Sequence, residues 1–392
     1  MHPPPTRQTD LRRTIIVLGT GQTLAWASSY YLIAILAVPI AQDIGFDSNW
    51  VFGAFSASLL ISALMGPRIG RTIDSFGGRG VLSASSVVIA TGLVVLALAQ
   101  SLEMVWAAWL ILGVGMGLGL YDSAFAALGR IYGDQARKAI TGITLIAGFA
   151  STIGWPLTSW GLAEIGWRDT CLVWAAANIL LGLPLNRFLI PKTEPPVAAA
   201  DGSKPVKPHI PMDRSMWLLG FAFAAAWIVT AAMAVHLPRM LETAGATTAQ
   251  AIAAGAMIGP AQVAARLLEA GFLSRFHALV TARLAAAAHP VGVGLLFVLG
   301  GTFPYGFALF HGAGNGILTI ARGTVPLAVF GPENYGYRLG LLGAPARIGQ
   351  AAAPLMFGFL IDEIGTGALY VSSGLSLAAL AAFCMLRSAK PG

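Results

Sequence analysis

Charged residues are scarce in this chain, and so are cysteines. Asp, Glu, Lys and Arg make up 10% of its 392 residues, whereas about a quarter of a soluble domain is charged. The two cysteines, Cys171 and Cys384, both lie in apolar runs. A disulfide-rich scaffold is therefore excluded, and we expect two packed thiols.

The residue patterns of common enzyme sites are also missing. There is no Gly-x-x-x-x-Gly-Lys-Ser/Thr loop for a phosphate, which argues against an ATP-driven pump. The six histidines are scattered without metal-ligand spacing, and no Ser-His-Asp arrangement is placed for catalysis. We expect no enzyme, no cofactor and no bound metal.

Long apolar runs dominate instead, because hydrophobic residues make up 56% of the chain. A spanning helix needs about 20 mostly apolar residues, and such runs recur from end to end. Residues 1–13 are polar, so we expect no cleaved signal peptide. The sequence predicts an all-α polytopic membrane protein with transmembrane helices at roughly 14–42, 49–69, 80–99, 104–131, 139–163, 169–190, 216–241, 248–272, 282–300, 303–330, 339–361 and 367–386.

The chain divides into two related halves. The stretch 191–214 is rich in proline and lysine, which suits an extended tether. On either side of it, Gly113-x-Gly115-x-Gly117 recurs as Gly312-x-Gly314-x-Gly316, and Pro156-Leu157 recurs as Pro354-Leu355. These repeats predict two pseudo-symmetric six-helix halves, 1–190 and 215–392, joined by a linker at 191–214.

The positive charges predict the orientation. With the N-terminus inside, the inner segments hold 19 of the 24 Lys and Arg residues, and the outer loops hold only Arg168 and Arg239. By the positive-inside rule both termini are cytoplasmic, in a bacterial-type inner membrane. This asymmetry accounts for the net charge of +7, so no nucleic-acid partner is expected. We expect a monomer in the lipid bilayer.

The polar loop at 70–79 resembles the loop between the second and third helices of major facilitator superfamily transporters. Gly70, Asp74, Gly77 and Arg79 fall on the spacing of that motif. Ser75 stands where the family has a basic residue. With the repeat, the resemblance implies the major facilitator fold, a secondary transporter working by alternating access. It also implies a gating role for the loop, in which Asp74 and Arg79 bridge helix ends of the first half with Arg130 as a partner.

An arginine at membrane depth must face a cavity or a partner, and Arg266, Arg322 and Arg347 are such residues. Arg266 follows Gln262 by four residues. This resembles the Asp-x-x-x-Arg of the eighth helix in monocarboxylate transporters, whose Arg binds the substrate carboxylate. Gln262 replaces the Asp. The alternative is a structural ion pair of Arg266 with Glu269. Arg347 has two interpretations, structural or gating.

The tenth span carries a polar stripe. His311, Asn315, Thr319 and Arg322 share one helical face, which predicts a lining for water or substrate. Arg322 is either a second anion clamp or a partner of Asp122. We expect Gln262, Asn315 and Thr319 to orient the anion.

Four residues of the first half complete the predicted site. Asp122 in span 104–131 is either a protonatable coupling group or a permanent partner of an arginine. Tyr121 precedes it, and Trp26 and Tyr30 lie at helical spacing in the first span. We expect these three aromatic residues to line the substrate cavity, although packing and interface roles are the alternative.

The sequence predicts a secondary transporter of a small organic anion, most simply a carboxylate, coupled to protons as a symporter. One alternative is an efflux antiporter for drugs or metabolites in the same superfamily. The other is a membrane receptor on the same scaffold that binds without transporting. Substrate identity, the direction of transport and the coupling ion do not follow from the residues.

Overall fold

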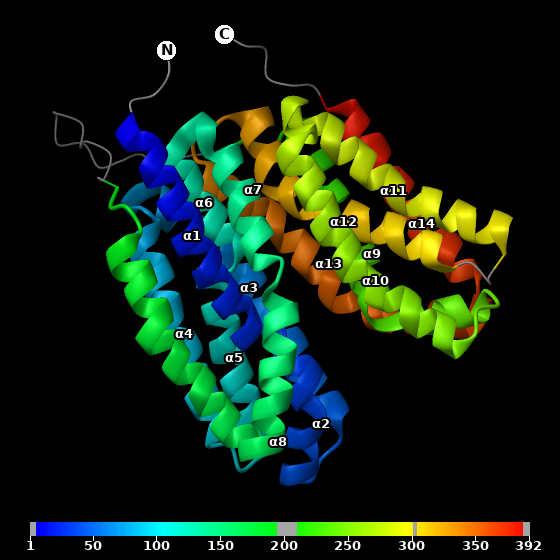
Figure 1. Cartoon of the computed structure of the whole chain (residues 1–392), viewed down its shortest axis with the longest axis horizontal. Coiled ribbons are helices and arrows are strands. Elements are labelled where there is room, and N and C mark those ends of the chain that lie inside the picture. Colours follow the sequence, from blue (N-terminus) through cyan, green and yellow to red (C-terminus); the bar gives the residue numbers. More distant parts are fainter. Residues whose placement is uncertain (1–4, 194–209, 301–303, 387–392) are drawn as a thin grey trace. The chain divides into compact units, whose positions relative to one another are not determined.

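The computed structural model describes residues 5–193, 210–300 and 304–386, and all the regular elements in those ranges are helices. The helices form two compact units (Figure 1). Unit 1 is Met1–Ile210 with Pro332–Leu341, and unit 2 is Pro211–Gly331 with Leu342–Gly392. Most of the predicted linker, residues 194–209, lies outside the described residues. The predicted division at 191–214 stays a prediction.

Unit 1 contains eight α-helices. They are α1 (Pro5–Ser28), α2 (Ile33–Ile44), α3 (Ser48–Phe76), α4 (Gly78–Ala97), α5 (Leu102–Gly119), α6 (Tyr121–Tyr132), α7 (Ala136–Ala147) and α8 (Ala150–Ala177). The helical path then continues through two short π-helical segments, η2 (Asn178–Gly182) and η3 (Leu185–Leu189). Gly166, with φ of 80°, turns the chain inside α8, between the predicted spans 139–163 and 169–190.

Unit 2 is built from six α-helices, the fifth of which begins in unit 1. They are α9 (Arg214–Thr243), α10 (Thr248–Gly271), α11 (Ala278–Leu299), α12 (Pro304–Phe330), α13 (Tyr335–Ile364) and α14 (Gly367–Met385). Residues up to Leu341 of α13 belong to unit 1 and the rest to unit 2. Each unit has its own apolar core, around Trp109 and Leu93 in unit 1 and around Phe307 and Phe357 in unit 2.

Three predicted spans are not continuous helices. The first span breaks at residues 29–32 between α1 and α2, the fourth at Leu120 between α5 and α6, and the fifth at residues 148–149 between α7 and α8. The prediction of one helix per span is wrong at these points. Broken backbone at membrane depth is tolerated where it is buried in protein or lines a cavity, which makes the breaks candidates for a functional site.

In the described part of the chain, eight segments are long and apolar enough to cross a membrane. They cover ten predicted spans, because the segment Leu102–Leu189 contains three of them. The helices left out are α12 and α13, which carry the polar stripe of the tenth span and Arg347. The polar residues of these two helices therefore lower their apolar signal.

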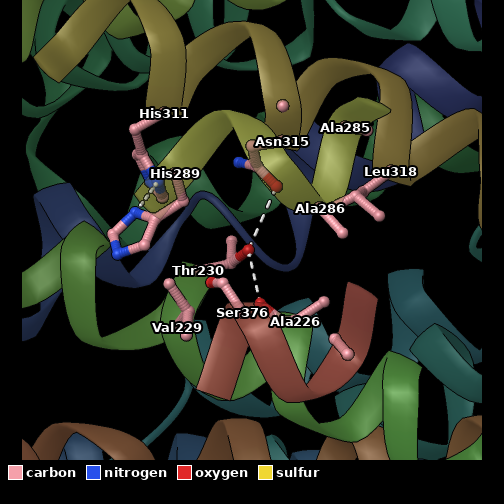
Figure 2. Close-up of a pocket in the computed structure, with 12 residues that line it drawn as sticks. Ala226, Val229, Thr230, Ala285, Ala286, His289, His311, Asn315, Leu318 and Ser376 are labelled. Atoms are coloured by element: carbon pink, nitrogen blue, oxygen red, sulfur yellow. Dashed lines mark hydrogen bonds between the residues drawn. The ribbon is translucent and has the colours of Figure 1, made fainter. Parts of the chain in front are cut away.

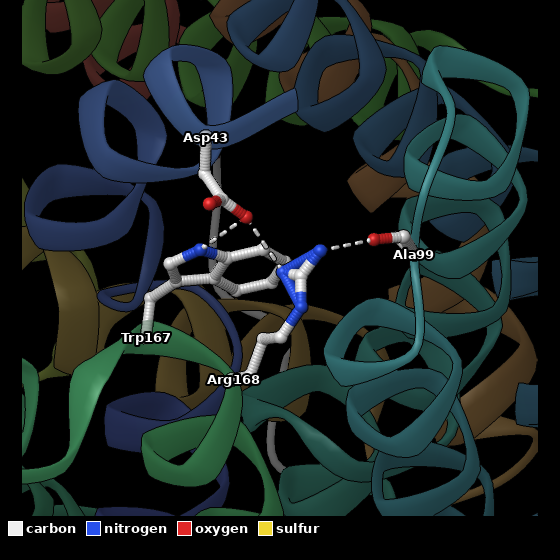
Figure 3. A network of polar contacts seen from close by, with 4 residues as sticks. All are labelled: Asp43, Ala99, Trp167 and Arg168. Atoms are coloured by element: carbon white, nitrogen blue, oxygen red, sulfur yellow. Dashed lines mark hydrogen bonds and ion pairs between the residues drawn. The ribbon is translucent and has the colours of Figure 1, made fainter. Parts of the chain in front are cut away.

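The two arginines predicted for the outer loops each form an ion pair with an aspartate. Arg168 contacts Asp43 at 2.8 Å and donates to the carbonyl of Ala99, and Trp167 donates to the same carboxylate (Figure 3). In unit 2, Arg239 pairs with Asp362. Each unit thus ties the end of its first predicted span to a later helix. Of the two cysteines, Cys171 is buried as predicted, but Cys384 is exposed, so the packed-thiol prediction is wrong there.

Candidate functional site

The helix breaks of unit 1 gather aromatic residues. Trp26, at the end of α1, lies 5.1 Å from Tyr30 and 5.0 Å from Tyr121, measured between ring centroids. Tyr30 follows α1 in the first break, and Tyr121 begins α6 just after the second. Phe125 stacks on Tyr121 at 5.2 Å. The structure therefore brings together the three aromatic residues that the sequence proposed for unit 1.

Gln22 supports the break between α5 and α6. Its side-chain amide donates to the carbonyl of Gly119 at 2.5 Å, a group at the end of α5 that the interruption at Leu120 deprives of a helical partner. The Gln22 Oε1 atom and the indole N–H of Trp26 are both buried without a hydrogen-bond partner. Buried polar groups are normally paired, so a donor and an acceptor remain available beside the aromatic residues.

Asp122 lies in the first turn of α6. A helix N-terminus favours negative charge because its backbone N–H groups point outward. Tyr335, the first residue of α13, is fully buried and packs against Gly129 of α6. Burial raises the pKa of the Tyr335 phenol well above its usual value, and the charges of Asp122 and Asp74 raise it further. Asp122 thus belongs to a cluster of acidic groups around the start of α13.

The predicted gating loop contacts that same start. The Asp74 carboxylate accepts hydrogen bonds from the backbone N–H groups of Gly336 at 2.8 Å and Tyr337 at 2.7 Å. The sequence predicted that Asp74 would bridge helix ends of the first half, but its partners lie in α13, beyond the predicted first half. Arg71 lies over the Tyr337 ring, 4.5 Å from its centroid.

Glycine makes this approach possible. A Cβ atom on Gly70 would overlap the carbonyl of Gly336, so only glycine fits there. Gly77, with φ of 82°, turns the chain between α3 and α4. Arg79 donates to the carbonyl of Arg187, a contact within the first half. Burial raises the pKa of the Asp74 carboxyl, while the hydrogen bonds from Tyr337 and Gly336 and the charge of Arg130 act in the opposite direction.

Arg322 is a buried cation of unit 2. Its side chain is 8% exposed, and its guanidinium lies 5.0 Å from the centroid of the Trp227 ring on α9. A guanidinium stacked on an aromatic face keeps its hydrogen-bond donors in a plane, the geometry that recognises a carboxylate. The sequence singled out Arg322 but not Trp227, because a tryptophan in an apolar run is equally well explained by ordinary helix packing.

Arg266 is held by its own helix and by α12. Its side chain donates to Gln262 Oε1 at 3.3 Å and to the Gly316 carbonyl at 3.4 Å. Glycine at position 316 allows α10 to approach this closely, because a Cβ there would contact the Gln262 backbone at 2.6 Å. Glu269, three residues on, is fully buried. The alternative of an Arg266–Glu269 ion pair stays a prediction.

The polar stripe of α12 divides between two neighbours. Asn315 accepts from the hydroxyl of Thr230 on α9 at 3.1 Å, whereas Thr319 donates to the Asn315 carbonyl of its own helix. His311 contacts His289 of α11 at 3.0 Å. The sequence reasoning missed His289, although a lone histidine before Pro290 in an alanine-rich run was a signal that could have found it.

Comparison with known proteins identifies the family of the chain. A family model described as Major Facilitator Superfamily matches residues 18–310. The chain therefore belongs to the major facilitator superfamily. It is 26% identical over 348 residues to a gentisate transporter of Corynebacterium glutamicum, covering 82% of this chain and 76% of that protein.

Two solved structures share the fold. The human organic anion transporter MFSD10 (TETRAN) matches with a TM-score of 0.75 and 18% identity, covering 97% of this chain and all of that one. The transporter FucP in its outward conformation matches with a TM-score of 0.75 and 15% identity, covering 94% of this chain and 97% of that one. The predicted fold class is confirmed, and the protein is a transporter and not an enzyme.

Proposed function

We propose that this protein is a secondary transporter of a small organic carboxylate, coupled to protons and working by alternating access. The observation that carries the proposal is Arg322, a buried guanidinium over the Trp227 ring in a helix within an apolar chain. An intramembrane arginine is a functional residue by default. A carboxylate accepts two parallel hydrogen bonds from a guanidinium, so this group suits an anionic substrate.

Arg266 is the second proposed anion-binding residue, with Gln262 beside it as an orienting group. Its hydrogen bonds to Gln262 and Gly316 hold the guanidinium in one place, which limits the entropy lost when a ligand binds. Asn315 and Thr319 of α12 are proposed to orient the substrate.

In unit 1, Trp26, Tyr30 and Tyr121 are the proposed substrate contacts. Their rings lie at two helix breaks, and an aromatic surface of this kind suits an apolar or aromatic part of a ligand. The likeness to a gentisate transporter and to an organic anion transporter supports an anion as substrate. Kinship with the monocarboxylate transporters rests on Arg266 alone and remains part of the proposal.

Asp122, half-buried in the first turn of α6, is the proposed proton-coupling group, since a carboxyl at membrane depth is a candidate proton carrier. We propose that the loop residues gate the transporter together with Arg130 and do not bind substrate. These loop residues are Gly70, Asp74, Gly77 and Arg79. We propose cytoplasmic termini in an inner membrane on the asymmetry of Lys and Arg, and we also propose a monomeric state.

The test is transport by purified protein in liposomes. A thermal-shift screen against gentisate, benzoate, lactate and phosphate selects the probe, and counterflow of that labelled probe then measures transport. We expect a carboxylate to stabilise the protein and to exchange across the membrane. Binding without flux would indicate a receptor, and flux of amphipathic drugs but of no carboxylate would indicate the efflux alternative.

A further inference from the structure

A chain of polar side chains links three helices of unit 2. His311 Nδ1 of α12 lies 3.0 Å from His289 Nδ1 of α11, and His289 Nε2 lies 2.9 Å from the Ser372 hydroxyl of α14. Both histidines are 5% exposed. Phe307 stacks on the His311 ring, with centroids 5.8 Å apart.

One arrangement of protons satisfies all of these hydrogen bonds together. With the hydroxyl hydrogen of Ser372 donated to the Leu369 carbonyl at 2.9 Å, His289 donates from Nε2 to the Ser372 oxygen at 2.9 Å. A neutral His289 then accepts at Nδ1, and His311 donates from its own Nδ1. The lone pair of the histidine pair therefore lies on His311 Nε2.

A small cavity adjoins the pair. It has a volume of about 20 Å³ and is bordered by α9, α11, α12 and α14, with His289, His311, Asn315, Thr230 and Ser376 among its lining residues (Figure 2). About 10–15 Å³ is enough for one water molecule, provided that polar partners are present. The side chains of Thr230 and Asn315 supply such partners beside His311.

The histidines are the titratable groups of this cavity. Among the described residues that line it, no other side chain can ionise. Elsewhere on the helices around the pair, Arg283 is engaged by the carbonyls of Phe383 and Leu386, and His236 by that of Pro354. Other charged residues on the helices of unit 2 are Arg214, Arg239, Glu242, Arg266, Glu269, Arg322, Arg347, Asp362 and Glu363.

We propose that His311, backed by His289 and Ser372, is a proton-binding site of the second half, filled from water in the adjacent cavity. A hydronium ion gives its proton to the lone pair of His311 Nε2 and leaves as neutral water. The imidazolium formed still donates through Nδ1 to His289, which passes the polarisation on to Ser372. Release returns the same proton from Nε2 to water.

This site is separate from the proposed anion clamp. His311 and Arg322 lie on the same helix and are eleven residues apart, which is about 16 Å along the axis. The inference rests on the proposed proton-coupled transport, and it adds to Asp122 a proton carrier in the second half.

The experiment separates proton coupling from substrate movement. Proteoliposomes loaded with gentisate, the probe anion, are first assayed by counterflow at equal pH. Accumulation of gentisate is then measured when a pH difference of one unit across the membrane drives uptake. One proton per monoanion sustains about tenfold accumulation, since one pH unit corresponds to about 1.4 kcal/mol. We expect His311→Gln to keep counterflow and to lose the tenfold accumulation.

A matched control is His277→Asn, an exposed histidine at the start of α11 whose capping role asparagine can keep. It should retain both activities. Tenfold accumulation by His311→Gln would overturn the inference, and so would loss of counterflow in a folded His311→Gln protein. If the wild type shows counterflow neither of gentisate nor of any other carboxylate, the proposed function is overturned instead.

A second variant keeps the inference testable if His311→Gln does not fold. Ser372→Ala removes the acceptor of the His289 N–H group and so weakens the chain that stabilises the charged pair. We expect accumulation by this variant to require a more acidic medium than the wild type. An unchanged pH dependence would overturn the inference.

Discussion

The Asp74 carboxylate accepts hydrogen bonds from the backbone N–H groups of Gly336 and Tyr337, at 2.8 and 2.7 Å. Two consecutive amides at the start of α13 are thus bound by one side chain at the end of α3. Hydrogen bonds to a charged group contribute about 1.5–3 kcal/mol each, enough to bias a transport cycle if they break in each turnover.

Asp74→Ala should therefore slow transport and change the anion affinity of the detergent-solubilised protein only modestly. Asp74→Asn keeps one oxygen acceptor, so its transport rate should lie between those of Asp74→Ala and the wild type. Counterflow in liposomes and thermal shift in detergent measure the two effects, with the exposed Ser75→Ala as control. A loss of binding as large as that from Arg266→Ala would show that Asp74 belongs to the binding site.

Gly70→Ala should open the same contact from the other side. The added methyl group would overlap the Gly336 carbonyl, whereas at Gly80 it would meet no atom within 4 Å. We expect hydrogen exchange at residues 336–337 to become faster in Gly70→Ala and to stay unchanged in Gly80→Ala. Equal exchange in the two variants would mean that α3 and α13 do not stay in contact.

Arg322→Ala should fold and lose anion binding, because the cation that attracts the carboxylate is gone. Arg322→Lys should keep part of the binding, since the charge survives while the paired donors are lost. Thermal shift and equilibrium binding separate folding from affinity. If Arg322→Ala instead lowers stability and Asp122→Asn restores it, Arg322 is a structural partner, because removing one member of a buried pair costs about 3–5 kcal/mol.

Trp227→Ala should weaken anion binding less than Arg322→Ala does. A cation over an aromatic face is worth about 0.5–2 kcal/mol, so affinity should fall by up to about thirtyfold. Trp227→Phe keeps an aromatic face and is the matched control. Wild-type affinity in Trp227→Ala would indicate that the ring does not position Arg322.

Asp43→Asn should hardly change stability. The side chains of Arg168 and Asp43 are 38% and 50% exposed, and such ion pairs contribute about 0–1 kcal/mol. Arg168→Ala should cost more, because it also loses the hydrogen bond to Ala99 and the contact with Trp167. Unfolding midpoints compare the variants, with Asp362→Asn of unit 2 as reference. A larger effect of Asp43→Asn would assign this network a role in the fold.

Local composition was sufficient to find the helices. Hydropathy predicted the membrane spans, and helical spacing predicted the polar stripe that ends at Arg322. The internal repeat came from recurring glycine and proline patterns, and the loop at 70–79 from its resemblance to a family motif. These features follow from the sequence because a backbone in lipid must bond to itself, so each apolar run becomes a helix by itself. The aromatic residues Trp26 and Tyr121 were chosen for their type and place in those runs.

Contacts between distant segments were decided only by the tertiary structure. The interruption at Leu120 is supported by Gln22, 97 residues away from the Gly119 carbonyl that it binds. Asp74 meets an α13 backbone that no sequence pattern marks, and His289 meets His311 because α11 packs against α12. Such pairings depend on which helix faces meet. Helix faces are matched by the packing of side chains from remote parts of the chain, and spacing along one segment does not encode that match.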